Sequence, residues 1–297
     1  MYASVIIPVC DQSESLRITL RFFSHQTYPV NNYEIVLVDD GSSDGLEEKM
    51  QEASWPRLGC KVKYIRQENQ GRAIARNNGV HNAEGEILIF CDADRFPGKD
   101  FVRRHVENNL NYPGHAVIGC PWDYLGIVKY LIKENQDTEW DKILKFSRKP
   151  LYYLKLSKLF NDKGLENSGI AWAAFLVGNA SLSKKDFCDV CGFDSEFKSW
   201  GFEHFELALR LQKNGIKFIS CPDIDSYHIP HPRKQGYYRT MIESSVELFV
   251  RKHPEYPVQH LKRFLFGEIS LQQFEKEFDG VVSKTLGNHD PIFYTLK

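Results

Sequence analysis

The sequence predicts an α/β fold with a mostly parallel, doubly wound sheet and a C-terminal helical extension. Before residue 115, short apolar runs rich in β-branched residues alternate four times with amphipathic segments. This alternation is typical of strand–helix units in a parallel sheet. Several of the runs lack polar alternation, which indicates strands buried on both faces. Beyond residue 236 only helical periodicity remains.

The N-terminal elements follow one another with short turns. The first helix has Leu16, Leu20 and Phe23 at helical spacing, with Asp11 or Ser13 as its cap. Strands are expected at residues 4–9, 33–38, 60–65 and 87–90, and helices at 14–26, 46–53 and 71–82.

The second half is less regular. Strands are expected at 174–183 and 218–221, and helices at 203–214, 237–252 and 258–278, with a tail or an arm on a partner subunit after Gly280. Residues 122–165 mix aromatic residues and lysines at irregular helical spacing. Two interpretations of this segment stay open: a pair of surface helices, or a lid over a site.

Composition narrows the class of protein. The chain has 297 residues, 42% of them hydrophobic, which is enough for one large domain or for one domain with an appendage. With 38 Lys+Arg against 39 Asp+Glu, nothing suggests a nucleic-acid partner. Of the seven cysteines, Cys188 and Cys191 form a Cys-x-x-Cys pair, which we interpret as structural thiols. No signal peptide or long apolar run is evident, so a cytoplasmic protein without a transmembrane segment is expected.

Two carboxylates follow the buried strand at 87–90. Asp92 and Asp94 end that strand, and ligands of open α/β sheets bind at the carboxyl ends of strands. Hard oxygen donors beside a diphosphate suit Mg²⁺ or Mn²⁺. Asp is also common in turns, and Asp-x-Asp alone does not decide between the two interpretations.

Neighbouring features favour the ligand site. Pro8 and Asp40 end the first two strands on the same rim, and Asp40 can accept a hydrogen bond from a nucleobase N–H. Arg72 and Arg76 lie one turn apart on a helix and can neutralise phosphate. His228 follows a short strand and can complete a metal site with Asp94.

Together these motifs resemble a family 2 glycosyltransferase with the GT-A fold. The resemblance spans residues 1 to about 231 and rests on six segments in order: 5–9, 38–44, 71–77, 92–94, 178–181 and 200–203. It implies a GT-A domain at 1–235, with a nucleotide-sugar half at 1–115, an acceptor half at 116–235 and a lid-like insertion at 122–165, followed by the extension at 236–297.

The resemblance also implies roles for individual residues. The residues expected to contact the donor are Pro8, Asp11, Asp40, Arg72, Asp92 and Asn179. Asp94 and His228 are expected to bind the metal, and Trp200 is expected to border the acceptor. Many inverting relatives have Glu-Asp where this chain has Glu203-His204. Four interpretations stay open: His204 is the base, Glu203 is the base, the acceptor is a nucleophile such as an amine or thiol that needs little help from a general base, or the transfer is retaining. Of these we favour inversion with Glu203 or His204 as the base.

The expected function follows from the resemblance. It is transfer of a hexose or N-acetylhexosamine from a UDP-sugar, with Mn²⁺ or Mg²⁺, to a glycan, peptide or small-molecule acceptor. The C-terminal helices are expected to be able to form a homodimer. The alternative is a degenerate, non-catalytic module that binds a nucleotide sugar or glycan. A nucleotidyltransferase is disfavoured because residues 4–16 lack the glycines of a phosphate loop.

Overall fold

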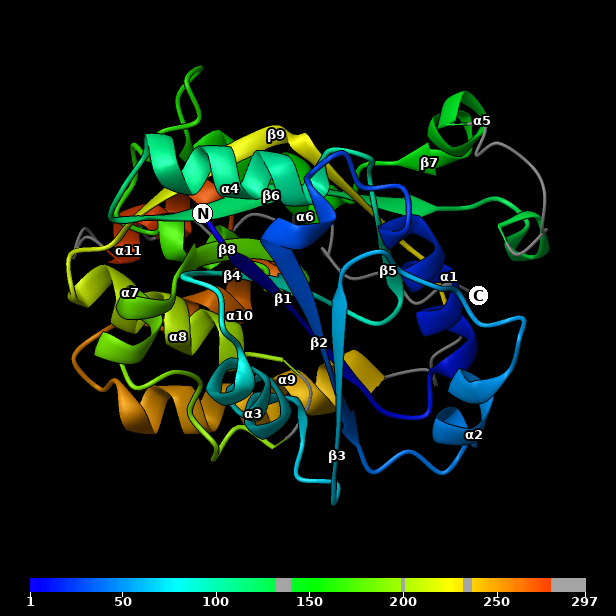
Figure 1. The fold of residues 1–297 in the computed structure, drawn as a ribbon. Helices are drawn as coiled ribbons and strands as arrows, with labels where there is room; N and C mark the ends of the chain where they lie inside the picture. Colours follow the sequence, from blue (N-terminus) through cyan, green and yellow to red (C-terminus); the bar gives the residue numbers. More distant parts are fainter. Residues whose placement is uncertain (132–139, 199–200, 232–236, 279–297) are drawn as a thin grey trace.

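The computed structural model describes residues 1–131, 140–198, 201–231 and 237–278. Its centre is one mixed sheet in the order β3-β2-β1-β4-β8-β6-β9-β5, with β7 paired to β6 (Figure 1). The strands are β1 (Ala3–Val9), β2 (Tyr33–Asp40), β3 (Lys61–Gln67), β4 (Ile87–Cys91), β5 (Arg95–Pro97), β6 (His115–Tyr124), β7 (Ser147–Arg148), β8 (Asn179–Ser183) and β9 (Lys217–His228). The α-helices are α1 (Ser13–Phe23), α2 (Leu46–Gln51), α3 (Arg72–Asn82), α4 (Phe101–Asn111), α5 (Trp140–Lys145), α6 (Leu151–Leu156), α7 (Lys184–Asp189), α8 (Glu203–Lys213), α9 (Tyr237–Lys252), α10 (Gln259–Leu265) and α11 (Leu271–Phe278).

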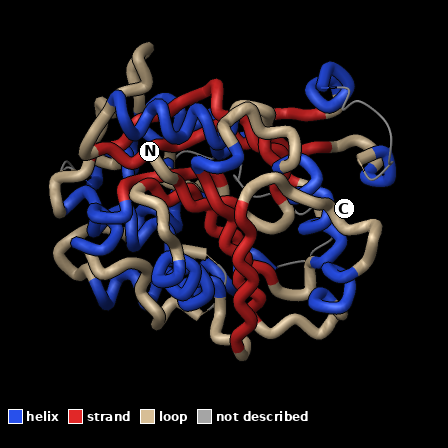
Figure 2. Tube along the Cα trace, viewed as in Figure 1, coloured by secondary structure: helices blue, strands red, loops and turns tan. Residues whose placement is uncertain are grey.

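The N-terminal half confirms the predicted doubly wound sheet. Strands β3, β2, β1 and β4 are parallel neighbours. Successive residues of a strand point to opposite faces, so Val5 and Ile7 pack with α1, α2 and α4, whereas Ile6 packs with α3 and α8. Helices therefore cover both faces of the strands (Figure 2).

The second half of the sheet differs from the prediction. β8 is antiparallel to both β4 and β6, and β6 is parallel to β9. Of the strand expected at 174–183 only β8, residues 179–183, forms, because Ala174 ends a 3-10 helix and residues 175–178 form a loop with a turn. The strand expected at 218–221 is part of the longer β9. Helix α4 and strand β6 were not predicted from the sequence pattern.

The C-terminal helices pack onto the same core as the sheet. Trp172 is fully buried, and its ring contacts Phe205 of α8, Phe249 of α9 and Phe274 of α11. The division at residue 235 therefore stays a prediction. The predicted tail after Gly280 lies outside the described residues. Within the described residues, no helix combines the length and apolar character needed to span a bilayer.

Candidate active site

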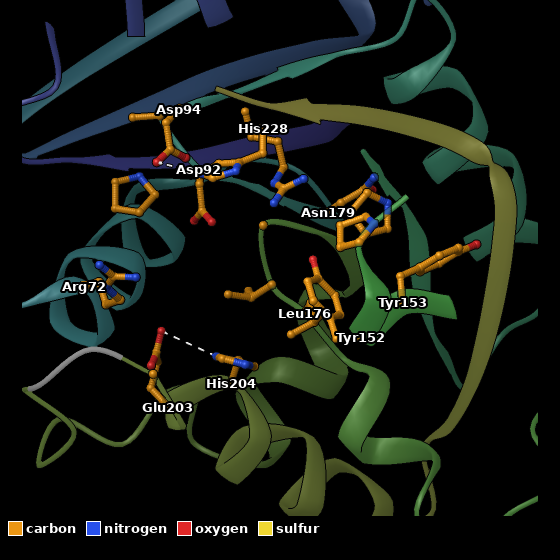
Figure 3. A pocket seen from close by; sticks show the side chains of 18 of the residues that line it. Arg72, Asp92, Asp94, Tyr152, Tyr153, Leu176, Asn179, Glu203, His204 and His228 are labelled. Atoms are coloured by element: carbon orange, nitrogen blue, oxygen red, sulfur yellow. Dashed lines mark ion pairs between the residues drawn. The ribbon is translucent and has the colours of Figure 1, made fainter. Parts of the chain in front are cut away.

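The carboxyl ends of β1, β2 and β4 open into a cavity of about 800 Å³. Its walls include nine of the predicted site residues: Pro8, Asp40, Arg72, Asp92, Asp94, Asn179, Glu203, His204 and His228. In Figure 3, Asp92, Asp94 and His228 lie on one side of the cavity, and Glu203 and His204 lie on the other. Trp200 lies outside the described residues.

Asp11 and Asp40 organise the loops at the rim. The Asp11 carboxylate accepts hydrogen bonds from the backbone and hydroxyl of Ser43, and Asp11 is not part of the cavity wall. Asp40 is buried and accepts from the backbone N–H groups of Gln70 and Gly71 at 2.9 and 2.8 Å. These bonds fix the loop that precedes α3, so Asp40 sets the position of Arg72 at the start of that helix.

Asp94, His228 and His231, here called the Asp-His-His cluster, converge on one point. Oδ2 of Asp94 lies 3.8 Å from Nε2 of His228 and 3.6 Å from Nδ1 of His231. One ligand atom from each residue lies within 4.8 Å of the other two. On the other side of its ring, Nδ1 of His228 lies 3.4 Å from Oδ1 of Asp123. That contact favours the tautomer whose Nε2 lone pair faces the cluster.

Arg76 joins the two sides of the cavity. Its fully buried guanidinium donates to Oδ1 of Asp92 at 2.8 Å and to Oε1 of Glu203 at 2.9 Å. Burial alone would raise the pKa of Asp92, but Arg76 and the nearby Arg72 and Arg95 lower it. The sequence predicts that Arg76 neutralises phosphate. In the structure its guanidinium is committed to protein carboxylates instead.

Glu203 and His204 begin helix α8. Burial would raise the pKa of Glu203, but His204 and Arg76 hold it well below its usual range. Nδ1 of His204 lies 3.7 Å from Oε1 of Glu203. Oε2 of Glu203 and Nε2 of His204 are buried and have no hydrogen-bond partner in the described part of the chain. Since unpaired buried polar atoms are costly, their place at a cavity wall indicates a ligand contact.

Asn179 is held in a buried network. Its Oδ1 lies 3.0 Å from Nε2 of His105, and its Nδ2 donates to the backbone oxygen of Ile224 and the hydroxyl of Ser226 at 2.9 and 2.8 Å. Burial lowers the pKa of His105 to about 3, so its ring is neutral. The amide therefore joins β8 to α4 and β9, and it also forms part of the cavity wall.

Several residues of the site were not predicted from the sequence. His231 follows His228 after two residues, and that spacing was the available signal. Arg95 and Tyr152 also line the cavity. Gly178 belongs to the predicted motif at 178–181 and also lines the cavity, where a Cβ would meet Oδ2 of Asp92 at 2.5 Å and Nε of Arg95 at 3.0 Å, so only glycine fits there. The 122–165 segment supplies Arg148 to Leu154 to the wall, and its action as a lid stays a prediction.

Solved structures of low sequence identity share this fold. Staphylococcus aureus TarS 1-349 in complex with UDP has a TM-score of 0.58 at 16% identity, with 95% of this chain and 83% of that chain covered. The mannosyltransferase PcManGT from Pyrobaculum calidifontis, in complex with GDP-Man and Mn²⁺, has a TM-score of 0.60 at 19% identity, with coverages of 88% and 69%. The predicted GT-A fold is confirmed. The sheet, with the Asp-x-Asp cavity at its strand ends, therefore defines an α/β protein of the GT-A fold.

The family is shown by the sequence. Residues 4–173, more than half of the chain, match the model of glycosyl transferase family 2. Residues 167–232 match a second model, described as the N-terminal domain of galactosyltransferase. The chain belongs to glycosyl transferase family 2, as predicted.

Curated relatives agree with this assignment. The uncharacterized glycosyltransferase YfnE of Bacillus subtilis is 29% identical over 262 residues, which cover 78% of this chain and 66% of the relative. Validoxylamine A glucosyltransferase of Streptomyces hygroscopicus subsp. jinggangensis is 27% identical over 288 residues, with coverages of 92% and 67%. Chondroitin synthase of Escherichia coli is 26% identical over 283 residues, with coverages of 88% and 40%. The chain thus spans about two thirds or less of the length of these relatives.

Proposed function

We propose that this chain transfers a hexose or N-acetylhexosamine from a UDP-sugar to a hydroxyl of a glycan, peptide or small-molecule acceptor, with inversion at the anomeric carbon. One observation supports this most. A single cavity holds the Asp-His-His cluster on one side and, on the other, the Glu203 and His204 atoms that have no hydrogen-bond partner among the described residues. The names of relatives that transfer glucose or synthesise chondroitin are consistent with such donors.

The Asp-His-His cluster fits a divalent cation. One carboxylate and two imidazoles within 4.8 Å of one another suit Mn²⁺ better than Mg²⁺, because Mg²⁺ prefers an all-oxygen shell. The Asp123 carboxylate beside His228 provides the outer contact that orients a ligating imidazole. Bound there, the ion would stabilise charge on the departing diphosphate. Arg72 lines the same cavity and adds a cation for phosphate.

His204 is the base in this proposal, and Glu203 positions it. Oε1 of Glu203 accepts a hydrogen bond from Arg76, and the pKa of the Glu203 carboxyl is lowered, so Glu203 is a weak proton acceptor. Nδ1 of His204 faces that carboxylate, and its Nε2 has no partner among the described residues. Imidazole is the side chain most often used as a general base near neutral pH. Oε2 of Glu203 is then available to a second acceptor hydroxyl.

Donor hydrolysis tests the proposal without a known acceptor. UDP-glucose, UDP-galactose, their N-acetyl forms and GDP-mannose would each be incubated with Mn²⁺, Mg²⁺ or EDTA. We expect slow release of UDP from one donor, fastest with Mn²⁺ and abolished by EDTA. Early ¹H NMR of the released sugar should show the anomer opposite to that of the donor.

Other results would contradict parts of the proposal. Release of the same anomer would contradict inversion and the role of His204. Saturable binding of a UDP-sugar without release, even with added glycan acceptors, would support the degenerate binding module. Binding of none of these donors by the folded chain would contradict the donor assignment altogether.

A further inference from the structure

The β6–β7 region exposes a concentration of large apolar side chains. The described residues contain ten exposed large apolar side chains, and six of them lie between residues 125 and 154. Single exposed apolar residues are common on protein surfaces, but clusters mark interaction sites. We name the following set the basic-apolar patch: Leu125, Ile127, Tyr130, Leu144, Phe146 and Leu154, with the exposed Lys129, Lys142, Lys145, Arg148 and Lys158.

The inward side of this region is already packed. Leu131 and Ile143 are buried in a cluster with Phe22 of α1 and Tyr227 of β9. The backbone N–H of Leu125 donates to the oxygen of Phe146 at 2.8 Å and extends the β6–β7 pairing. In Figure 1, α5 and β7 stand out from the body of the sheet. The apolar residues of the patch between residues 125 and 146 are therefore exposed on an anchored protrusion, and the exposed Leu154 lies on α6.

The charge of the region favours an anionic partner. Residues 125–158, which span the patch, contain eight basic residues and four acidic ones, although the whole chain has a net charge of −1. Lysines that alternate with exposed Leu and Phe are typical of surfaces that lie on a membrane. Lysine is depleted at the cores of protein–protein interfaces. An anionic lipid surface therefore complements the patch better than another protein does.

The patch extends to the mouth of the active-site cavity. Leu125, Arg148 and Leu154 are exposed and also line the cavity. We propose that the basic-apolar patch binds the surface of an anionic lipid bilayer, with the cavity mouth toward the lipid. The contact is peripheral and rests on exposed side chains. It does not depend on which donor or acceptor the site uses.

Vesicle co-sedimentation tests the proposal with the full chain. Vesicles of phosphatidylcholine with about 30 mol% phosphatidylglycerol would be compared with pure phosphatidylcholine. The patch variant combines Phe146→Ser with Lys145→Glu. The matched control combines Leu110→Ser with Lys217→Glu, an exposed leucine and an exposed lysine outside the patch. We expect about tenfold tighter binding to the anionic vesicles, and a loss of at least about tenfold in the patch variant only.

Salt and a second variant complete the test. Raising NaCl from about 0.1 to 1 M shortens the Debye length from about 10 to 3 Å and should weaken binding. If the first variant does not fold by circular dichroism, Ile127→Ser with Lys129→Glu replaces it. Equal binding to neutral and anionic vesicles, or equal binding of patch variant and wild type, would overturn the proposal. So would self-association through the patch without any lipid binding.

Discussion

His204 lies at the N-terminus of α8, with Nδ1 toward Glu203 and with Nε2 at the cavity wall, where no other described residue bonds it. Replacing His204 with Ala removes the proposed proton acceptor and leaves Glu203 and Arg76 in place. We expect kcat for UDP release to fall by about 10²- to 10⁴-fold, because general-base catalysis contributes that much. The Kd for UDP, measured by calorimetry, should change little.

A conservative variant provides the control for His204. His204→Asp keeps a proton acceptor at this position and should recover part of the lost rate. A His204→Ala enzyme with wild-type kcat would show that the acceptor is activated by another group.

Ion pairs around Arg76 predict a pH dependence of stability. The pKa values of Asp92 and Glu203 are lower in the folded protein than in the unfolded chain. Their stabilisation is therefore complete above about pH 4.5, the ordinary value for Glu, and is lost as the pH falls toward the folded-state pKa. Urea unfolding should show a steeper loss of unfolding free energy from about pH 5 to 3 in wild type than in Glu203→Gln. Glu14→Gln, which alters an exposed carboxylate, should match wild type.

The roles of single residues were predictable where a local motif carries them. Asp94 follows β4 and His228 is the last residue of β9, and the structure brings them together at the cavity. The role of Arg76 was not predictable, because its partner Glu203 is 127 residues away in the chain. The local sequence around an arginine on a helix is the same whether its guanidinium binds a phosphate or a buried carboxylate.

At the scale of elements, Gly119 lies at a register irregularity of β6 that leaves room for the Asn179 side chain. The β6–β9 register shifts between Ile118 and Cys120. A Cβ at Gly119 would lie 2.0 Å from Oδ1 of Asn179. We expect Gly119→Ala to reduce the free energy of unfolding by about 1–3 kcal/mol through overpacking, measured by urea denaturation.

A double-mutant cycle isolates the cause of that loss. In an Asn179→Ala background the amide is gone, so Gly119→Ala should cost clearly less than it does in wild type. An equal cost in both backgrounds would assign the effect to the backbone of β6 rather than to the amide.

The same irregularity explains why β6 was not predicted from the sequence. Gly119 and Pro121 interrupt its apolar pattern, and both residues are typical of turns. By contrast, the uninterrupted apolar runs of β1, β2 and β4 were predicted almost to the residue. The antiparallel direction of β8 depends on pairing with β4 and β6, which no local pattern encodes. An apolar run such as residues 171–174 shows only that a segment is buried.

At the scale of the whole molecule, the proposed metal links strands that are distant in sequence. Asp94 follows β4, whereas His228 and His231 lie at and just after the end of β9. A ligand that binds only the folded state stabilises it, by about 2.7 kcal/mol at a concentration 100-fold above Kd. We expect Mn²⁺ to raise the Tm more than Mg²⁺ does, and His231→Ala to reduce the Mn²⁺ shift.

An exposed histidine serves as the control. His81→Ala, on the surface of α3, should keep the full Mn²⁺ shift. If Mn²⁺ raised the Tm of His231→Ala as much as that of wild type, the metal ligands would be Asp94 and His228 alone, as the sequence predicts.

The shared guanidinium of Arg76 has a consequence for enzyme engineering. Asp92 and Glu203 lie on different elements, yet both are bonded to the same buried cation. Removing one partner of the buried Arg76–Glu203 pair costs about 3–5 kcal/mol. The Asp92 side chain is 32% exposed but bonds the same cation, so changes at positions 76, 92 and 203 are coupled. A library meant to alter acceptor preference should hold these three constant. Diversity is better placed at cavity residues outside this set, such as Leu125, Tyr152 and Leu154.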